Sequence, residues 1–123
     1  MYTILLVEDE IEILMALEKF FTSQGFTPVA VQTGSKAIEI VNSGTKIDIA
    51  ILDLKMPGMM GFDCLKEIRK IKTDIPVIFL TGSIHKARYA DTLKSFNLGI
   101  EDVLGKPIDL YILLEEVKKR LEK

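Results

Sequence analysis

The sequence predicts an α/β fold in which helices cover both faces of a parallel sheet. Short apolar segments alternate with longer amphipathic segments from one end of the chain to the other. The first apolar segment, residues 3–7, has no polar alternation, which is typical of a strand buried on both faces. Strict alternation of strands and helices produces a parallel sheet, and the right-handed rule for crossovers leaves few topologies for it.

The first half of the chain is expected to contain strands at residues 3–7, 27–31 and 47–52 and helices at residues 10–24 and 33–41. In the first helix, Ile11, Leu14 and Phe21 recur at helical spacing and form an apolar stripe. Gly25 follows this helix and is suited to the left-handed conformation that ends one. Pro28 has no amide hydrogen to donate, so the second strand is expected at an edge of the sheet.

The second half is expected to contain helices at residues 61–71, 83–97 and 110–121 and strands at residues 75–80 and 101–104. Thr33, Ser83 and Asp109 precede three of the predicted helices and have side chains suited to N-caps. Gly99 is expected to close the fourth helix. The five strand–helix units predict a flavodoxin-like (βα)5 three-layer sandwich with strand order 2-1-3-4-5, which places Pro28 on an edge strand.

Length and composition limit the classes to which the chain can belong. A chain of 123 residues, 48% of them hydrophobic, predicts a single domain over residues 1–123 with a packed core. A net charge of -2 argues against binding to nucleic acid. The single cysteine, Cys64, fits a reducing compartment, and no apolar run approaches the ~20 residues of a membrane span. We therefore expect a soluble cytoplasmic domain.

Polar side chains follow four of the five predicted strands. Glu8 and Asp9 come after the first strand and Asp53 after the third, while Thr81 and Lys106 come after the fourth and fifth. In an open parallel sheet, ligands bind beyond the carboxyl ends of the strands, where the strand order reverses. We therefore expect these five side chains to meet at one edge of the sheet.

The acidic members of this group indicate a divalent cation. Glu8, Asp9 and Asp53 leave adjacent strands in the predicted topology, and carboxylates this close resist ionising together. A hard cation such as Mg²⁺ removes that repulsion, because it prefers oxygen ligands and retains water or phosphate in its shell. The alternative is a solvated acidic rim without a ligand, which the addition of Thr81 and Lys106 at the same edge disfavours.

The same residues predict phosphoryl transfer onto Asp53. A carboxylate can attack phosphorus and carry the phosphoryl group as an acyl phosphate. A metal ion neutralises the charge that opposes this attack. Lys106 offers a positive charge to one phosphoryl oxygen, and Thr81 offers a hydroxyl donor to another.

Four segments resemble the receiver domain of the two-component response-regulator family. In chain order they are residues 4–10 with the acidic pair, residues 53–61 with the pattern Asp-x-x-Met-Pro-Gly-x-x-Gly, residues 78–82 ending in Thr-Gly, and residues 99–107 ending in Lys-Pro. The resemblance extends over essentially the whole chain, and the order of the motifs makes it highly specific.

The resemblance implies a role for each residue of the cluster. Asp53 would accept a phosphoryl group from a phosphohistidine on a sensor histidine kinase or a phosphotransfer protein. Thr81 and Lys106 would bind phosphoryl oxygens. The implied Mg²⁺ ligands are the side chains of Glu8, Asp9 and Asp53 and the backbone carbonyl of Lys55.

The resemblance also implies how the signal is passed on. The surface formed by the fourth helix, fifth strand and fifth helix would bind a downstream protein, and phosphorylation could produce a homodimer. The chain would catalyse only its own phosphorylation and dephosphorylation, so we do not expect an enzyme. The Lys106–Pro107 bond is cis in this family. The family often has Tyr or Phe where this chain has Val103, which puts the usual coupling between that aromatic residue and Thr81 in doubt.

Three alternatives were weighed against this interpretation. A pseudo-receiver that binds partners without phosphorylation is disfavoured by the complete set of acidic residues, Thr81 and Lys106. A flavin-binding carrier needs a phosphate-binding loop after the first strand, where Glu8 and Asp9 would repel a phosphate. An aspartyl phosphatase usually needs an acid where Lys55 stands. A stand-alone regulator and one domain of a longer protein both fit the sequence.

Overall fold

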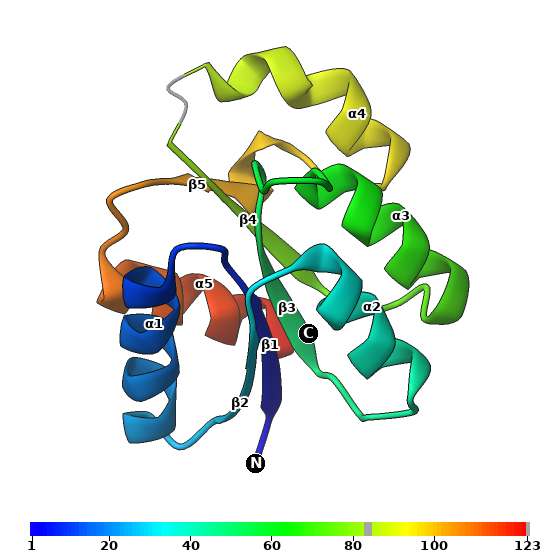
Figure 1. The fold of residues 1–123 in the computed structure, drawn as a ribbon. Helices are drawn as coiled ribbons and strands as arrows, with labels where there is room; N and C mark the ends of the chain where they lie inside the picture. Colours follow the sequence, from blue (N-terminus) through cyan, green and yellow to red (C-terminus); the bar gives the residue numbers. More distant parts are fainter. Residues whose placement is uncertain (83–84, 123) are drawn as a thin grey trace.

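The computed structural model describes residues 1–82 and 85–122, and its centre is a parallel sheet of five strands (Figure 1). The strands are β1 (Thr3–Val7), β2 (Thr27–Val31), β3 (Ile49–Asp53), β4 (Val77–Thr81) and β5 (Val103–Gly105). Their order in the sheet is β2-β1-β3-β4-β5, and every neighbouring pair is parallel. This confirms the predicted flavodoxin-like fold and strand order, including the edge position of the strand that contains Pro28.

Five α-helices connect and cover the strands. They are α1 (Ile11–Ser23), α2 (Gly34–Asn42), α3 (Gly61–Ile71), α4 (Ala90–Ser95) and α5 (Leu110–Leu121), with 3-10 turns η1 (Lys86–Tyr89) and η2 (Ile100–Asp102). Helices α1 and α5 lie on one face of the sheet, and α2, α3 and α4 lie on the other (Figure 1). None of the helices in the described part of the chain is long and apolar enough to cross a membrane.

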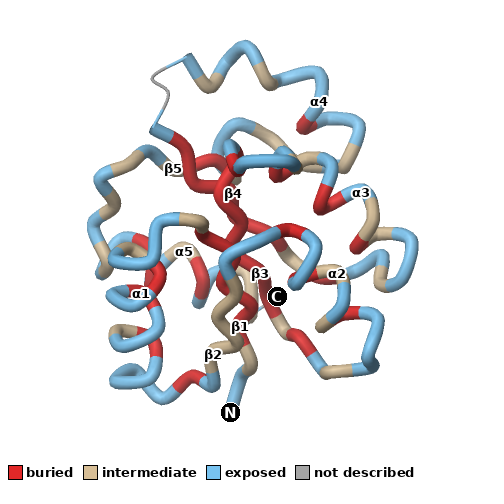
Figure 2. The backbone as a smooth tube through the Cα atoms, viewed as in Figure 1, coloured by how far each residue is buried: buried red, intermediate tan, exposed pale blue. Residues whose placement is uncertain are grey.

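The central strands are buried on both faces, as their continuous apolar sequences predict. Ile4 and Leu6 of β1 pack into the cluster formed with α1 and α5, while Leu5 and Val7 pack into the cluster formed with α2, α3 and α4. Side chains alternate between faces along a strand, so an apolar run without polar alternation supplies both cores. Figure 2 shows this burial concentrated in the central strands and on the inner sides of the helices.

Three of the predicted helix ends are confirmed. Gly25 has a φ of 89° after α1, and the ring of Phe26 packs edge-on against Phe21 with 5.3 Å between centroids. Thr33 caps α2 by accepting a hydrogen bond from the amide of Lys36. Asp109 caps α5 by accepting hydrogen bonds from the amides of the second and third residues after it. These caps satisfy amides that have no partner within the helix.

The fourth helix differs from its prediction. The predicted helix 83–97 is instead the 3-10 turn η1 followed by the six-residue α4, and the proposed cap Ser83 lies outside the described residues. Gly99 does not close the helix, since its φ of -132° is extended. Asn97 does so with a φ of 61°, while the amide of Leu98 donates to the carbonyl of Leu93. Asparagine tolerates this left-handed conformation better than other residues that carry a side chain, which the prediction overlooked.

Two apolar residues at helix ends are exposed, although periodicity places both on an inner face. Ile11 is 48% exposed and Ile71 is 40% exposed. They are the first residue of α1 and the last residue of α3. A terminal residue has no further helical turn on one side to cover it, so periodicity alone overestimates its burial.

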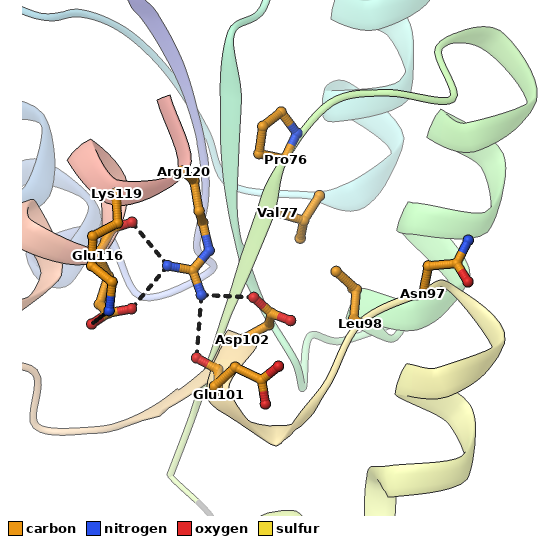
Figure 3. A pocket seen from close by; sticks show the side chains of 9 residues that line it. All are labelled: Pro76, Val77, Asn97, Leu98, Glu101, Asp102, Glu116, Lys119 and Arg120. Carbon is orange, nitrogen blue, oxygen red and sulfur yellow. Dashed lines mark hydrogen bonds and ion pairs between the residues drawn. The ribbon is translucent and has the colours of Figure 1, made fainter. Parts of the chain in front are cut away.

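Arg120 ties α5 to the segment before β5 (Figure 3). Its guanidinium donates to Oδ1 of Asp102 at 2.6 Å, to the carbonyl of Glu101 at 3.2 Å and to Oε1 of Glu116 at 2.9 Å. These groups border an open pocket of about 600 Å³. Burial lowers the pKa of Arg120, but Glu116 and Asp102 outweigh it and leave the pKa raised. The hydrogen bond from Arg120 is the main cause that lowers the pKa of Glu116.

Replacing Arg120 by Met is expected to lower the free energy of unfolding by about 2 kcal/mol at neutral pH, because hydrogen bonds to charged groups contribute about 1.5–3 kcal/mol. Lys119→Met is the matched control. Lys119 pairs with the same Glu116, but its side chain is 69% exposed, so its loss is expected to stay within about 0.5 kcal/mol. Urea denaturation measures both variants.

The effect of Arg120→Met should also depend on pH. Glu116 has its pKa lowered from the ordinary value of 4.5 in the folded chain. The stability that it contributes is therefore present above pH 4.5 and is lost as the pH falls through its folded pKa. The difference between native chain and variant should shrink in acid. A difference that is the same in acid as at neutral pH, or no larger than that of Lys119→Met, would contradict this account.

Candidate functional site

The five residues predicted to meet at one edge of the sheet lie at the carboxyl ends of four of its strands. Glu8 and Asp9 directly follow β1, Asp53 ends β3, Thr81 ends β4 and Lys106 directly follows β5. Lys106 reaches Glu8 and Asp53, and its amide donates to the carbonyl of Thr81 at 2.8 Å. The strand order 2-1-3-4-5 brings these four strand ends together, although they lie far apart in the sequence.

Lys106 lies between two buried carboxylates. Its Nζ is 2.6 Å from Oε1 of Glu8 and 3.1 Å from Oδ2 of Asp53. Glu8 is 1% exposed and Asp53 is 4% exposed. The other oxygen of Glu8, Oε2, accepts the amide of Glu10 at 3.0 Å and thereby shapes the turn that contains Asp9. One ammonium group therefore offsets the negative charge of two acids that water does not reach.

Electrostatics at the site disfavour the ionised form of Asp53. Burial, followed by the hydrogen bond and the negative charge of Glu8, raises the pKa of Asp53 from 3.8 to about 7, and Lys106 opposes this shift only in part. Burial lowers the pKa of Lys106, but Glu8 and Asp53 outweigh it and leave that pKa raised. A second cation near Asp53 would stabilise its ionised form, which burial and Glu8 disfavour.

The acidic residues fit a hard divalent cation. Glu8, Asp9 and Asp53 each offer a carboxylate oxygen, and the three oxygens lie within 4.8 Å of one another. Oε1 of Glu8 is buried and has an ion pair with Lys106, but no hydrogen bond of good geometry. An all-oxygen donor set with an incompletely satisfied buried carboxylate suits Mg²⁺. The amide of Lys55 lies 3.4 Å from Oδ1 of Asp53, while the role of its carbonyl as a ligand stays a prediction.

Gly61 holds the loop after Asp53 against the sheet. A Cβ atom at Gly61 would lie 2.5 Å from the carbonyl oxygen of Asp53 and 3.0 Å from Cα of Leu54. Its amide donates to the carbonyl of Leu54 at 2.8 Å. Only glycine permits this close approach. The first residue of α3 therefore packs directly against the backbone of Asp53 and Leu54 and restricts the position of Asp53.

Sequence reasoning missed the contribution of Gly34. A Cβ atom there would lie 2.6 Å from Sδ of Met59, in the loop after Asp53, and the carbonyl of Gly34 accepts a weak hydrogen bond from the thiol of Cys64. The contact joins α2 to this loop, so no local signal in the sequence could reveal it. Cys64 itself is buried, and burial raises its pKa to about 11.

Comparison with known proteins identifies the family. The model of the response regulator receiver domain matches residues 4–118. The chain belongs to this family. Receiver domains are signalling modules of two-component systems, so the fold and the motifs at the sheet edge have a common explanation.

Individual receiver proteins agree with this assignment. Response regulator SaeR of Staphylococcus aureus is 32% identical over 123 residues, which covers 98% of this chain and 52% of SaeR. The chain thus spans about half the length of the curated relatives that it matches. The receiver domain of Francisella response regulator 1452 has a TM-score of 0.86 at 25% identity and covers 99% of this chain and 98% of its own.

A third relative was solved in complex with Mg²⁺-BeF. The response regulator protein TrrA of Thermotoga maritima, in complex with Mg²⁺-BeF, has a TM-score of 0.83 at 34% identity. The match covers 98% of this chain and 100% of that one. The two chains therefore share the fold over their full compared lengths.

The receiver domain departs from the family pattern at Val103. This residue is fully buried and is paired in register with Phe79 of β4. Its side chain has no polar atom and packs within the core between the sheet and α2, α3 and α4. Val103 therefore offers neither an aromatic ring nor a hydroxyl at this position.

Replacing Asp53 by Asn is expected to stabilise the metal-free chain at pH 8. The pKa of Asp53 is raised from 3.8 to about 7 in the folded state, so stability falls as the pH rises through this window. Asparagine has a similar shape without the charge, and we expect a gain of about 2 kcal/mol at pH 8 that shrinks towards pH 4. Urea denaturation without divalent cations measures the gain.

The control for this prediction is Asp63→Asn, which removes an exposed acid from α3. This variant should differ little from the native chain at either pH. The account of the site would be contradicted if Asp53→Asn were no more stable than the native chain at pH 8, or if its gain were independent of pH.

Proposed function

We propose that Asp53 accepts a phosphoryl group, in a Mg²⁺-dependent reaction, from a phosphohistidine on a sensor histidine kinase or a phosphotransfer protein. The observation that carries this proposal is the position of Lys106, which lies 3.1 Å from Asp53 and 2.6 Å from Glu8 beside a set of three converging carboxylates. This arrangement gives a nucleophilic oxygen, a cation for a phosphoryl oxygen and a metal site at a single point.

The chemistry follows from the roles of the side chains. An oxygen of Asp53 attacks phosphorus, the bond from phosphorus to the donor histidine breaks, and the histidine nitrogen keeps the electron pair. Lys106 is already beside Asp53 and pairs with a phosphoryl oxygen after transfer, while the hydroxyl of Thr81 donates to another. Hydrolysis of the acyl phosphate then restores the carboxylate.

Mg²⁺ would be held by Glu8, Asp9, Asp53 and the backbone carbonyl of Lys55. When bound, it would supply positive charge that offsets the repulsion between the acidic residues and the incoming phosphoryl oxygens. Asp9 is only partly buried, whereas Glu8 and Asp53 are almost fully buried. Solvent can therefore reach the metal from the side of Asp9, which suits an ion that retains water ligands.

Phosphorylation would act as a switch and would not turn over an outside metabolite. We propose residues 1–123 as a single cytoplasmic receiver domain that catalyses only its own phosphorylation and dephosphorylation. The surface of α4, β5 and α5 would bind a downstream protein, and a phosphorylated homodimer is a second possible output. A change in population between two arrangements of this surface would transmit the signal.

The chain is expected to take up one phosphoryl group from a small phosphodonor such as acetyl phosphate in the presence of Mg²⁺. Intact-protein mass spectrometry detects the adduct. Asp53→Asn should not be labelled, while Asp63→Asn, which lacks an exposed acid on α3, should be labelled like the native chain. A native chain that remains unlabelled would favour a pseudo-receiver that binds partners without phosphorylation.

Removing Asp9 is expected to weaken Mg²⁺ binding by roughly tenfold or more, because a hard cation then loses one of three carboxylate ligands. Isothermal titration calorimetry of Asp9→Asn and native chain measures the difference. Asp91→Asn, an exposed acid in the first turn of α4, is the control and should bind as the native chain does. Equal Mg²⁺ affinity for Asp9→Asn and the native chain would exclude Asp9 as a ligand.

A further inference from the structure

Two carbonyl groups that the sheet does not use lie at the outer edge of β5 and in the turn η2 directly before it. β5 is the last strand in the order β2-β1-β3-β4-β5. The amide of Lys106 points towards β4, where it donates to the carbonyl of Thr81. Backbone groups alternate in direction along a strand, so those of Val103 point to the opposite, open edge. Glu101 lies just before β5, in the 3-10 turn η2. Each of these two carbonyls needs another donor.

Two basic side chains supply these donors. Arg120 of α5 donates to the carbonyl of Glu101 at 3.2 Å (Figure 3). Lys86, the first residue of η1, donates through Nζ to the carbonyl of Val103 at 3.1 Å. The edge strand is thus tied to η1, and the turn η2 before it is tied to α5. The cation of Lys86 also protects an open strand edge from pairing with another chain.

The bond from Lys86 matters because η1 and α4 are weakly held. η1 has no buried residue, and α4 has a single buried side chain, that of Leu93. By contrast, α1, α2 and α5 each bury three residues, and α3 buries four. A further contact of η1 with the body of the domain is the ring of Tyr89, which lies 5.6 Å from that of Phe62. Elements with few buried contacts move at the lowest free-energy cost.

Lys86 is also linked, along the chain and by its hydrogen bond, to the groups that a phosphoryl group would affect. It follows Thr81 by five residues in the chain. Its acceptor, Val103, precedes Lys106 by three residues on β5. The buried aliphatic side chain of Val103 cannot itself respond to a charge on Asp53. The carbonyl of the same residue, however, connects η1 directly to the strand that positions Lys106.

We propose that Lys86 is a latch: its hydrogen bond to the carbonyl of Val103 holds η1 and α4 in the unphosphorylated arrangement and opens when Asp53 is phosphorylated. The latch rests on the proposed function. When Thr81 moves towards a phosphoryl group on Asp53, the chain after it follows, and a bond of 3.1 Å is lost with a displacement of about 0.5 Å. Lys86 is thus a positioning residue that sets the balance between two states.

The latch predicts that its removal makes the active arrangement easier to reach. Apparent affinity for a phosphoryl analogue scales with the fraction of the chain in the competent state. A partly exposed hydrogen bond from a charged donor should change this fraction by about fivefold. Lys86→Met, which keeps the length of the side chain and removes the donor, should therefore bind the analogue about fivefold more tightly.

The experiment uses beryllium fluoride with saturating Mg²⁺ and follows binding by calorimetry in four chains: native, Lys86→Met, Lys86→Arg and Lys94→Met. Arginine restores a donor at the same position, and Lys94 is an exposed lysine of α4. Amide hydrogen exchange over residues 85–95 is measured in parallel without beryllium fluoride. Lys86→Met should bind about fivefold more tightly and exchange faster over this segment. Lys86→Arg and Lys94→Met should resemble the native chain in both measurements.

The outcomes separate the latch from the proposed function. If the native chain binds beryllium fluoride and Lys86→Met binds it equally or more weakly, the latch is overturned while the proposed function stands. Unchanged hydrogen exchange over residues 85–95 in Lys86→Met overturns the latch as well, and so does a failure of Lys86→Arg to restore native behaviour. A native chain that binds no beryllium fluoride overturns the proposed function, and the latch falls with it.

Discussion

A single ammonium group, Nζ of Lys106, lies between the buried carboxylates of Glu8 and Asp53, and the strand order is what holds it there. The two acids end or follow adjacent strands, and Lys106 follows the edge strand on the far side of β4. Without this cation, two negative charges would face each other where water does not reach, at high free-energy cost. Even with it, the pKa of Asp53 stays raised to about 7. The site is therefore electrostatically incomplete in a way that favours both a divalent cation and a phosphoryl group.

The rest of the domain consists of firmly packed helices and one weakly held segment, η1 with α4. Two apolar clusters on opposite faces of the sheet fix α1, α2, α3 and α5, and close approach at Gly61 fixes the loop beside Asp53. The elements η1 and α4 have less of this support, since η1 has no buried residue and α4 has one buried side chain. A charge change at Asp53 would act on rigid strands first, and the weakly held helix would be the element that changes position.

Much of this could be predicted from the sequence, because its signals are local or follow from topology. Apolar runs without polar alternation predicted the buried strands, and Pro28 predicted that the second strand lies at an edge of the sheet. The polar residues that follow four of the strands predicted the cluster of functional side chains. The remaining features depend on packing. Asn97 ends α4 although Gly99 offered the stronger local signal, and the contact between Gly34 and Met59 joins segments that are distant in sequence. The bond from Lys86 to the carbonyl of Val103 is set by the open edge of β5, which sequence patterns do not display.

The most direct test of the central claim is a crystal structure of the native chain with Mg²⁺ and beryllium fluoride. The account predicts beryllium bonded to an oxygen of Asp53, Mg²⁺ at about 2.1 Å from carboxylate oxygens of the acidic cluster, and Nζ of Lys106 within hydrogen-bond distance of a fluorine atom. A structure from such crystals in which no ion is bound and Lys106 still bridges Glu8 and Asp53 would contradict it.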